Sequence, residues 1–233
     1  MRHRIYFPGP LTTADVSITG PELHHAARVV RLREGEPVEL FDGRGTAVAG
    51  EISAIGRDQI RVRVTGAVPS RESPLGLTVA MAIIQLEKFE LVLQKATELG
   101  AHAIVPLVTD RIEVRPERYR GKSARWEKIV LEAVKQSGRS AIPRLESVTP
   151  FEEATGRAGL KIVFDADVEP SPRPASASEA TIFIGPEGGW SERELAQARE
   201  QHCTFERLGT RRLRAETAAI AALAVLAARY GDI

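Results

Sequence analysis

The chain has 233 residues, of which 43% are hydrophobic and 27% charged, and its formal net charge is +1. This balance is typical of a folded globular protein and excludes an intrinsically disordered chain. No apolar run approaches the roughly 20 residues that span a bilayer, and no signal peptide is evident, so we expect a cytoplasmic protein. The single cysteine, Cys203, excludes an internal disulfide and a cysteine-based zinc site.

Residues 1–70 are predicted to form a small barrel of short β-strands. Val38–Phe41 and Thr46–Ile52 flank the polar turn Asp42–Gly45, which is the pattern of two strands joined by a tight turn. Ile60–Val64 alternates apolar residues with arginines, as a strand with one buried face does. We expect one short helix over Pro21–Leu32.

A linker and a second domain are predicted to follow the barrel. The segment 66–76 contains two prolines and two glycines in a polar setting, so we place a linker at 71–76 and the second domain at 77–233. Apolar strands then alternate with helices, which is typical of an α/β domain with a mainly parallel sheet covered on both faces. The expected strands are Leu77–Ile84, Ala103–Val108, Ile162–Phe164, Thr181–Ile184 and Phe205–Leu208. The expected helices are Glu87–Leu99, Ser123–Ser137, Ser191–Gln201 and Ala215–Tyr230.

A glycine-rich segment follows one of these strands. The strand ends at Gly185 and leads into Gly185-Pro-Glu-Gly-Gly189, and Ser191 and Glu194 then have the spacing of a helix capping box. Glycines let backbone N–H groups approach a ligand closely, and ligands bind beyond the carboxyl ends of strands in open α/β sheets. A plain strand–turn–helix connection explains the same residues, and this segment alone leaves both interpretations open.

An arginine-rich segment precedes the last predicted helix. Arg211, Arg212 and Arg214 lie directly before the N-terminus of this helix. Cations are disfavoured at the positive N-terminus of a helix unless a negative group is nearby. The negative group is either Glu216, a bound carboxylate or RNA phosphate. A third segment pair, Gln94–Gly100 and Gln136–Arg139, carries polar groups at two helix ends, which we expect to meet over the strand ends.

The basic residues indicate a nucleic-acid partner in spite of the low net charge. They comprise 26 Arg and 6 Lys, and Arg binds phosphate with two hydrogen bonds and stacks on bases. A general preference for Arg, with solvated charged faces, accounts for the clusters equally well. The adjacent His24 and His25 point in different directions and have no ligand cluster beside them, so we expect no metal.

Together these motifs resemble the RsmE family, bacterial small-subunit rRNA methyltransferases of the SPOUT superfamily. The resemblance is carried by the opening Arg4-Ile-Tyr6, the stretch from His25 to Leu32, the hairpin Phe41-Asp-Gly43, and the segments Gln94–Gly100, Gln136–Arg139, Gly185–Gly189 and Leu208–Thr217. The chain departs from the usual family pattern at Gln85-Leu86, Lys135 and Arg212.

The resemblance implies S-adenosylmethionine (SAM)-dependent methylation of uridine N3 at position 1498 of 16S rRNA. It also implies an N-terminal PUA-like β-barrel for RNA, a C-terminal parallel-sheet domain with a trefoil knot, and a homodimer. The cofactor residues it implies are Phe164, Asp165, Ile184, Gly185, Pro186, Glu187, Gly188, Gly189, Leu208, Gly209, Arg211, Leu213, Arg214 and Thr217. The RNA-binding residues are Arg2, Arg4, His25, Arg28, Arg31, Arg111 and Arg139.

Three residues are candidates for the chemistry. We expect Arg214 to stabilise negative charge that develops on the uracil or its phosphate. Glu187 and Glu98 are expected to remove the N3 proton or to orient that arginine. Two alternatives remain: a SPOUT-like methyltransferase that acts on a ribose 2′-hydroxyl or another base, and a catalytically silent rRNA-binding assembly factor. A nucleotide-dependent α/β enzyme is disfavoured because the sequence has no phosphate-binding loop.

Overall fold

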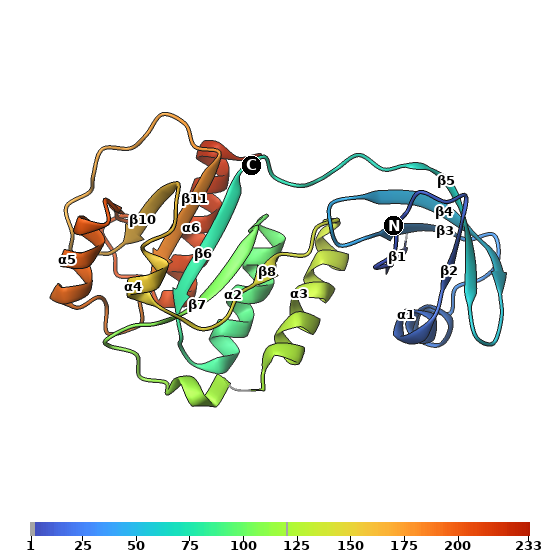
Figure 1. Ribbon diagram of the computed structural model, residues 1–233, viewed down its shortest axis with the longest axis horizontal. Helices are drawn as coiled ribbons and strands as arrows, with labels where there is room; N and C mark the ends of the chain where they lie inside the picture. Colours follow the sequence, from blue (N-terminus) through green and yellow to red (C-terminus); the bar gives the residue numbers. More distant parts are fainter. Residues whose placement is uncertain (1–2, 120) are drawn as a thin grey trace. The chain divides into compact units, whose positions relative to one another are not determined.

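The computed structural model describes residues 3–119 and 121–233, with the backbone alone at Arg28, Val29, Pro116 and Arg118. The chain divides into two compact units (Figure 1). The first unit contains the chain up to Glu72 together with Val134–Ile142, and the second contains Ser73–Ala133 and Pro143–Ile233. Within the described ranges no helix has both the length and the apolar character that a membrane span requires.

The first unit is built on a curled sheet (Figure 1) with the strand order β1-β3-β4-β5-β2. Its strands are β1 (His3–Tyr6), β2 (Asp15–Ile18), β3 (Pro37–Phe41), β4 (Ala47–Ile55) and β5 (Ile60–Ala67). β1 pairs with β3 in parallel, and the other pairs are antiparallel. The alternation predicted for β5 is confirmed, since Ile60 and Val62 are fully buried whereas Arg61 and Arg63 are exposed.

The helix predicted over Pro21–Leu32 has two parts. A short α-helix, α1 (Gly20–His24), continues into a π-helical turn, η1 (His25–Val30). The turn ends because Arg31 adopts a left-handed conformation with φ of +60°. Ala26 and Leu32 are buried and anchor this segment in the core of the first unit.

The segment Val134–Ile142 belongs to the first unit, whereas the predicted boundaries placed it in the second domain. Arg4 donates hydrogen bonds to the carbonyl oxygens of Val134 at 2.9 Å and Arg139 at 2.7 Å. The Glu72 carboxylate accepts from the Arg139 guanidinium at 2.7 Å and from the backbone N–H of Ser140 at 2.7 Å. These charged contacts hold the segment, and no local sequence pattern reports them.

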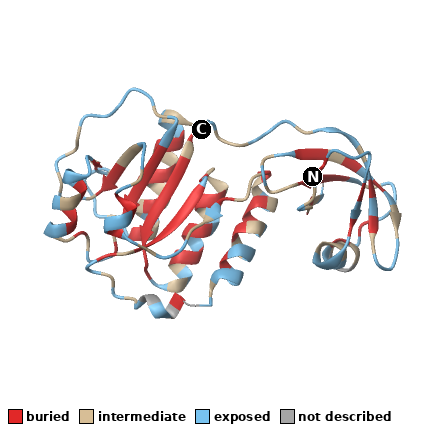
Figure 2. Ribbon diagram, viewed as in Figure 1, coloured by how far each residue is buried: buried red, intermediate tan, exposed pale blue. Residues whose placement is uncertain are grey.

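The described residues of the second unit form a seven-stranded sheet with all strands parallel. The strand order is β12-β10-β11-β6-β7-β8, and β9 also pairs with β7. The strands are β6 (Gly76–Ala82), β7 (Ala103–Val108), β8 (Arg144–Leu145), β9 (Thr149–Pro150), β10 (Leu160–Phe164), β11 (Glu179–Ile184) and β12 (Thr204–Glu206). The central strands are buried along nearly their whole length (Figure 2), as expected for a parallel sheet with covered faces.

Helices cover both faces of this sheet. They are α2 (Leu86–Glu98), α3 (Ser123–Ser137), α4 (Phe151–Ala154), α5 (Glu192–Glu200) and α6 (Ala215–Tyr230), with a 3₁₀ turn, η2, at Pro116–Tyr119. α6 packs against α2, β6 and β11. On the opposite face Phe151 of α4 packs against the rings of Phe183 and Trp190, with centroid distances of 5.6 and 4.6 Å. The predicted α/β architecture is confirmed.

Candidate functional site

Three loops leave the sheet of the second unit side by side. β10 is flanked by β11 and β12, and Phe164 is in register with both Ile184 and Glu206. Because the strands are parallel, the loops after β10, β11 and β12 start at the same edge. This is the edge at which open α/β sheets bind ligands.

A cavity of about 520 Å³ lies among these loops. Every residue that the sequence analysis proposed for the cofactor, except Thr217, lines it. The walls also include residues that were not proposed as cofactor ligands: Arg111, Ala166, Asp167, Trp190, Arg212, Ala215 and Ala218. The glycine-rich and arginine-rich segments, more than 20 residues apart in sequence, therefore form one site.

The glycine loop is closely packed against its surroundings. A Cβ atom on Gly185 would lie 3.1 Å from the Trp190 ring, and one on Gly188 would lie 3.1 Å from Cβ of Arg111. Gly189 has φ of +69°, a conformation that glycine adopts without strain. Its N–H donates to the Pro186 carbonyl at 2.9 Å and closes a tight turn. A side chain at Gly185 or Gly188 would therefore require its neighbour to move by a few tenths of an ångström, and one at Gly189 would strain the backbone.

Trp190 ties the glycine loop to the neighbouring strand. Its indole N–H donates to the carbonyl oxygen of Phe164 at 3.1 Å, and the side chain is buried. The N–H of Asp165 donates to the Glu206 carbonyl at 3.1 Å, so the ends of β10, β11 and β12 are joined directly. Trp190 was missed as a site residue, although its position directly after Gly189 was a usable signal.

The arginine-rich loop supplies exposed cations to the opposite wall. Arg214 precedes α6 as its N-cap residue, and Arg211, Arg212 and Arg214 are all exposed. Arg212 forms an ion pair with Asp167 of the loop after β10. Among the described residues, the ion pair formed by these arginines is to Asp167 and not to Glu216. Pairing with Glu216 alone therefore does not explain them. A buried carboxylate oxygen of Glu216 has no hydrogen-bond partner there.

Glu187 is held from outside the loop by Lys88 of α2, with the ammonium 3.3 Å from a carboxylate oxygen. Nearby, the Tyr119 hydroxyl donates to the carbonyl oxygen of Ile84. Burial raises the pKa of Tyr119 to about 12, and the negative charges of Glu187 and Glu90 add to the rise. Tyr119 is therefore a neutral hydrogen-bond donor at physiological pH and not a base.

Glu98 does not line the cavity, so the geometry of the cavity gives no support to a part for it in the chemistry. α2 runs back from the carboxyl end of β6, so its last turn precedes the amino end of β7. There Glu98 forms an ion pair with Lys95 at 2.9 Å. Thr217 is exposed on the first turn of α6 and does not line the cavity.

The residues proposed for RNA divide into exposed and buried groups. Arg4 and Arg139 are buried, with side-chain exposures of 9% and 6%, and both are paired with glutamates of the first unit. Both guanidinium groups are engaged within the first unit, and their contact with RNA stays a prediction. His25, Arg31 and Arg111 are exposed. Arg2 and the side chain of Arg28 lie outside the described residues.

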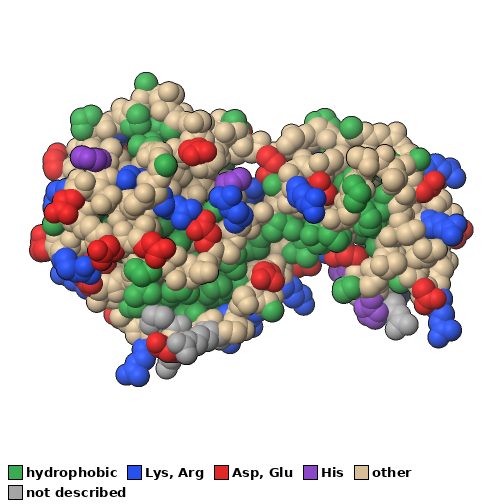
Figure 3. Space-filling view, viewed as in Figure 1, with side chains coloured by type: hydrophobic (Ala, Val, Ile, Leu, Met, Phe, Trp, Pro, Cys, Tyr) green, Lys and Arg blue, Asp and Glu red, His purple; other side chains and the backbone are tan. Residues whose placement is uncertain are grey.

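The departures from the family pattern have structural counterparts. Lys135 forms an ion pair with Glu22 at 2.6 Å within the first unit, Gln85 is the N-cap residue of α2, and Arg212 pairs with Asp167. Basic and acidic side chains are interspersed over the visible face of the second unit (Figure 3), in keeping with the low net charge. No group of three or more His, Cys, Asp or Glu side chains suited to a metal occurs in the described part of the chain.

Comparison with known proteins decides the family. Residues 71–227 match the family described as RNA methyltransferase domain, and residues 18–65 match the RNA methyltransferase PUA domain. The chain is 32% identical over 229 residues to ribosomal RNA small subunit methyltransferase E of Bacillus subtilis, covering 90% of this chain and 88% of that protein. The chain belongs to the ribosomal RNA small subunit methyltransferase E family. The resemblance found in the sequence, and the PUA-like first unit, are thereby confirmed.

Solved structures of relatives have the same fold throughout. The methyltransferase E of Neisseria gonorrhoeae, bound to S-adenosylmethionine, is 30% identical with a TM-score of 0.90, and all of both chains is covered. A protein of Legionella pneumophila in complex with SAM is 33% identical with a TM-score of 0.89, again over all of both chains. Both bind the cofactor that the sequence motifs implied.

The cavity of this chain fits such a cofactor. Its volume of about 520 Å³ lies within the range of roughly 300–1,000 Å³ usual for small-molecule sites. Ile184, Leu208 and Leu213 are among the residues that line it, and apolar side chains of this kind suit a ring such as adenine. Asp165 and Glu187 add two carboxylates to the lining of the cavity.

Proposed function

We propose that this chain is a SAM-dependent methyltransferase that methylates N3 of uridine 1498 in 16S rRNA. The observation that carries the proposal is the single cavity formed by the loops after β10, β11 and β12, lined by the family's two C-terminal signatures. Full-length similarity to SAM-bound relatives supports the cofactor, and the PUA domain match supports an RNA substrate.

The cofactor supplies an electrophilic methyl group when bound, and the protein supplies position and electrostatics. Residues of the cavity that we expect to hold it are Phe164, Asp165, Ile184, Gly185, Pro186, Gly188, Gly189, Leu208, Gly209, Arg211 and Leu213. Trp190 fixes the glycine loop from behind through its bond to Phe164.

The target atom lies on the Watson–Crick edge of uracil, so the base must be unpaired when it reaches the cavity. Methylation would form a bond from N3 to the methyl carbon while the bond of that carbon to the sulfonium sulfur breaks, and the N3 proton leaves. We expect Arg214, which is exposed and lines the cavity, to stabilise the negative charge that uracil acquires as this proton departs. Glu187 is the remaining candidate to receive the proton or to orient Arg214, because Glu98 lies at the other edge of the sheet.

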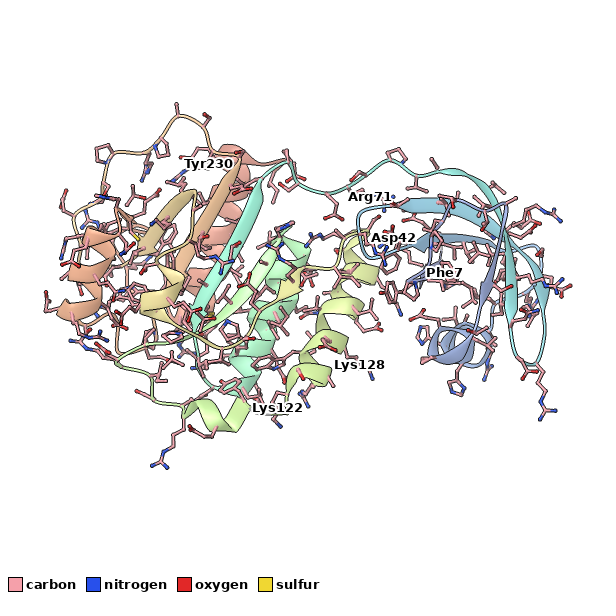
Figure 4. All side chains as sticks on the ribbon, in the orientation of Figure 1. Phe7, Asp42, Arg71, Lys122, Lys128 and Tyr230 are labelled. Carbon is pink, nitrogen blue, oxygen red and sulfur yellow. The ribbon has the colours of Figure 1, made fainter. Side chains whose placement is uncertain are left out.

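We propose in addition that the chain acts as a homodimer in the cytoplasm and that its C-terminal segment is threaded as a trefoil knot. Tyr230 of α6 (labelled in Figure 4) donates from its hydroxyl to the carbonyl of Pro174, so α6 contacts the loop that joins β10 and β11, but support for the threading itself is the resemblance. Support for the dimer is the resemblance alone.

Two measurements test the function. Calorimetric titration of SAM into the purified chain separates an enzyme from a silent assembly factor, since only the enzyme requires the cofactor. Mapping of methylated nucleotides in small-subunit rRNA from a strain lacking this protein then identifies the target. Loss of the N3 methyl group at uridine 1498 is expected, whereas loss of a ribose methyl group would contradict the base specificity.

A further inference from the structure

A cluster of polar contacts joins the carboxyl end of β7 to the start of α5. The backbone N–H of Asp110 donates to Oε1 of Glu194 at 2.9 Å. The Ser191 hydroxyl donates to Oδ2 of Asp110 at 2.5 Å, and the Arg193 guanidinium donates to Oδ1 of Asp110 at 2.6 Å. We call Asp110, Ser191, Arg193 and Glu194 the β7–α5 clamp.

Glu194 is the buried centre of the clamp, since it is only 1% exposed. Its other oxygen, Oε2, accepts from the N–H of Ser191 at 2.8 Å and completes the capping box of α5. The position in the first turn of the helix favours its negative charge. A capping box alone requires only Ser191 and Glu194, so the bonds to Asp110 are additional to it.

Both segments that form the β7–α5 clamp continue directly into residues that line the cavity. Ser191 follows Trp190, which lines the cavity and is bonded to Phe164. Arg111 follows Asp110, lines the cavity, and donates from its guanidinium to the carbonyl oxygen of Gly188 at 3.1 Å. The glycine loop is therefore fixed at its centre by Arg111 and at its exit by the clamp.

The charge state of Asp110 suits this task. A hydrogen bond from Arg193 and one from Ser191 hold the pKa of the Asp110 carboxyl below its ordinary value, against a small opposing effect of burial. Asp110 therefore stays a carboxylate, and so a double acceptor, throughout the physiological pH range.

We propose that Asp110 and Glu194 are positioning residues of the cofactor site. They lock β7 onto the exit of the glycine loop, so that Arg111 meets Gly188 and the loop backbone keeps the shape that lines the cavity. They act through Arg111, Gly188 and Trp190 and do not themselves line the cavity. The inference rests on the proposed function, since it takes SAM as the occupant.

The test is calorimetric titration of SAM into the purified, RNA-free full-length chain, paired with thermal unfolding of each variant without SAM. Asp110→Ala is expected to raise the Kd for SAM on the order of tenfold, the size of one lost charge-assisted hydrogen bond. Asp110→Asn keeps one acceptor oxygen for Ser191 and is expected to recover part of this loss. In single-turnover methylation at saturating SAM, the rate of Asp110→Ala stays within about threefold of the wild-type rate.

Glu146→Ala is the matched control. Glu146 also forms an ion pair with an arginine, Arg157 at 2.7 Å, and it lies in the same unit but outside the cavity. We expect Glu146→Ala to lower the unfolding temperature and to leave the Kd for SAM unchanged.

The outcomes separate the two proposals. If the wild type does not bind SAM, the proposed function fails and the inference fails with it. If the wild type binds SAM and Asp110→Ala, folded at the temperature of the titration, binds it equally well, the inference alone is overturned. Should Asp110→Ala not fold, Asp110→Asn and Glu194→Gln carry the test. Glu194→Gln replaces one carboxylate oxygen with an amide NH₂, which cannot accept the hydrogen bond from a backbone N–H of Asp110 or Ser191. An unaltered affinity for SAM in both Asp110→Asn and Glu194→Gln overturns the proposal.

Discussion

At the scale of single residues, some arginines of this chain are exposed at the cavity and others are buried in ion pairs. Arg214 is exposed at the N-terminus of α6 and lines the cavity. The helix dipole disfavours a cation at this position and stabilises a bound anion. Arg4 and Arg139 are buried and paired with Glu39 and Glu72. Burial and pairing, which sequence does not report, separate a group available to a substrate from a group that holds the fold.

Arg214→Ala is expected to lower the single-turnover rate of methylation by about 100- to 1,000-fold, the usual effect of removing a donor that stabilises developing negative charge. The Kd for SAM should change much less. Arg207→Ala is the control, because Arg207 is exposed in the same loop but does not line the cavity. A normal rate for Arg214→Ala would remove this residue from the mechanism.

Trp190 gives a prediction for stability. Trp190→Phe keeps an aromatic ring but leaves the Phe164 carbonyl without its indole donor, which costs about 1–3 kcal/mol when the group is buried. Trp126→Phe is the matched control, because Trp126 is equally buried and its indole nitrogen has no hydrogen-bond partner among the described residues. Denaturant unfolding should show the larger loss for Trp190→Phe. Equal losses would mean that ring volume, and not the hydrogen bond, accounts for the effect.

At the scale of elements, predictability followed length and periodicity. The bounds expected for Ala103–Val108, Ser123–Ser137 and Ala215–Tyr230 are those observed, because each has enough residues for its apolar spacing to define one structure. β8, β9 and α4 were not predicted. They have only two to four residues each, and β8 and β9 exist because β7 offers them a partner.

The positions of the two cavity loops could be predicted from the sequence, but their meeting in space could not. Gly185–Gly189 and Leu208–Arg214 were located from their composition, because three glycines in one segment and three arginines in the other follow predicted strands. Their meeting in one cavity depends on β10 lying between β11 and β12, an order that no local pattern encodes. The same holds for Asp110 and Glu194, whose contact joins residues 84 positions apart. Glu98 lies away from the cavity because α2 returns from the carboxyl end of β6 toward the amino end of β7, a direction that the local sequence pattern does not report.

At the scale of the whole molecule, the partly buried carboxylate of Glu72 links stability to pH. Burial raises the pKa of Glu72, but hydrogen bonds from Ala141, Arg139 and Ser140 outweigh it and hold the pKa below the ordinary value of 4.5. A carboxyl whose pKa is lowered by folding contributes stability that is complete above its unfolded pKa and is lost as pH falls through the folded pKa. Glu72 therefore stabilises the first unit at neutral pH and ceases to do so in acid.

Glu72→Gln should accordingly lower the unfolding temperature at pH 7 and flatten its decline below about pH 4.5, where protonation already removes the wild-type advantage. A change of 1 kcal/mol corresponds to about 2–4 °C in a chain of this size. Thermal unfolding between pH 3 and pH 7 measures the effect, and Glu200→Gln, at an exposed position of α5, is the control. Parallel curves for wild type and Glu72→Gln would contradict the linkage.

RNA binding by the whole molecule provides a further test, because it distinguishes exposed from buried arginines. Arg31 is exposed after η1, so Arg31→Ala should reduce the slope of log Kobs against log [salt] by roughly 0.7–0.9, the value for one lost phosphate contact. Arg4→Ala should instead destabilise the first unit by about 3 kcal/mol or more, since it leaves Glu39 buried without its closest partner.

Arg31→Ala and Arg4→Ala are therefore expected to have opposite effects on thermal stability and on the salt dependence of RNA binding. Arg31→Ala keeps its unfolding temperature and shows a smaller salt dependence in titrations with a small-subunit rRNA fragment. Arg4→Ala loses thermal stability and, measured at a temperature where it is folded, keeps the wild-type slope. A full slope in Arg31→Ala would return this arginine to the solvated surface, and a reduced slope in folded Arg4→Ala would mean that its guanidinium leaves Glu39 when RNA binds.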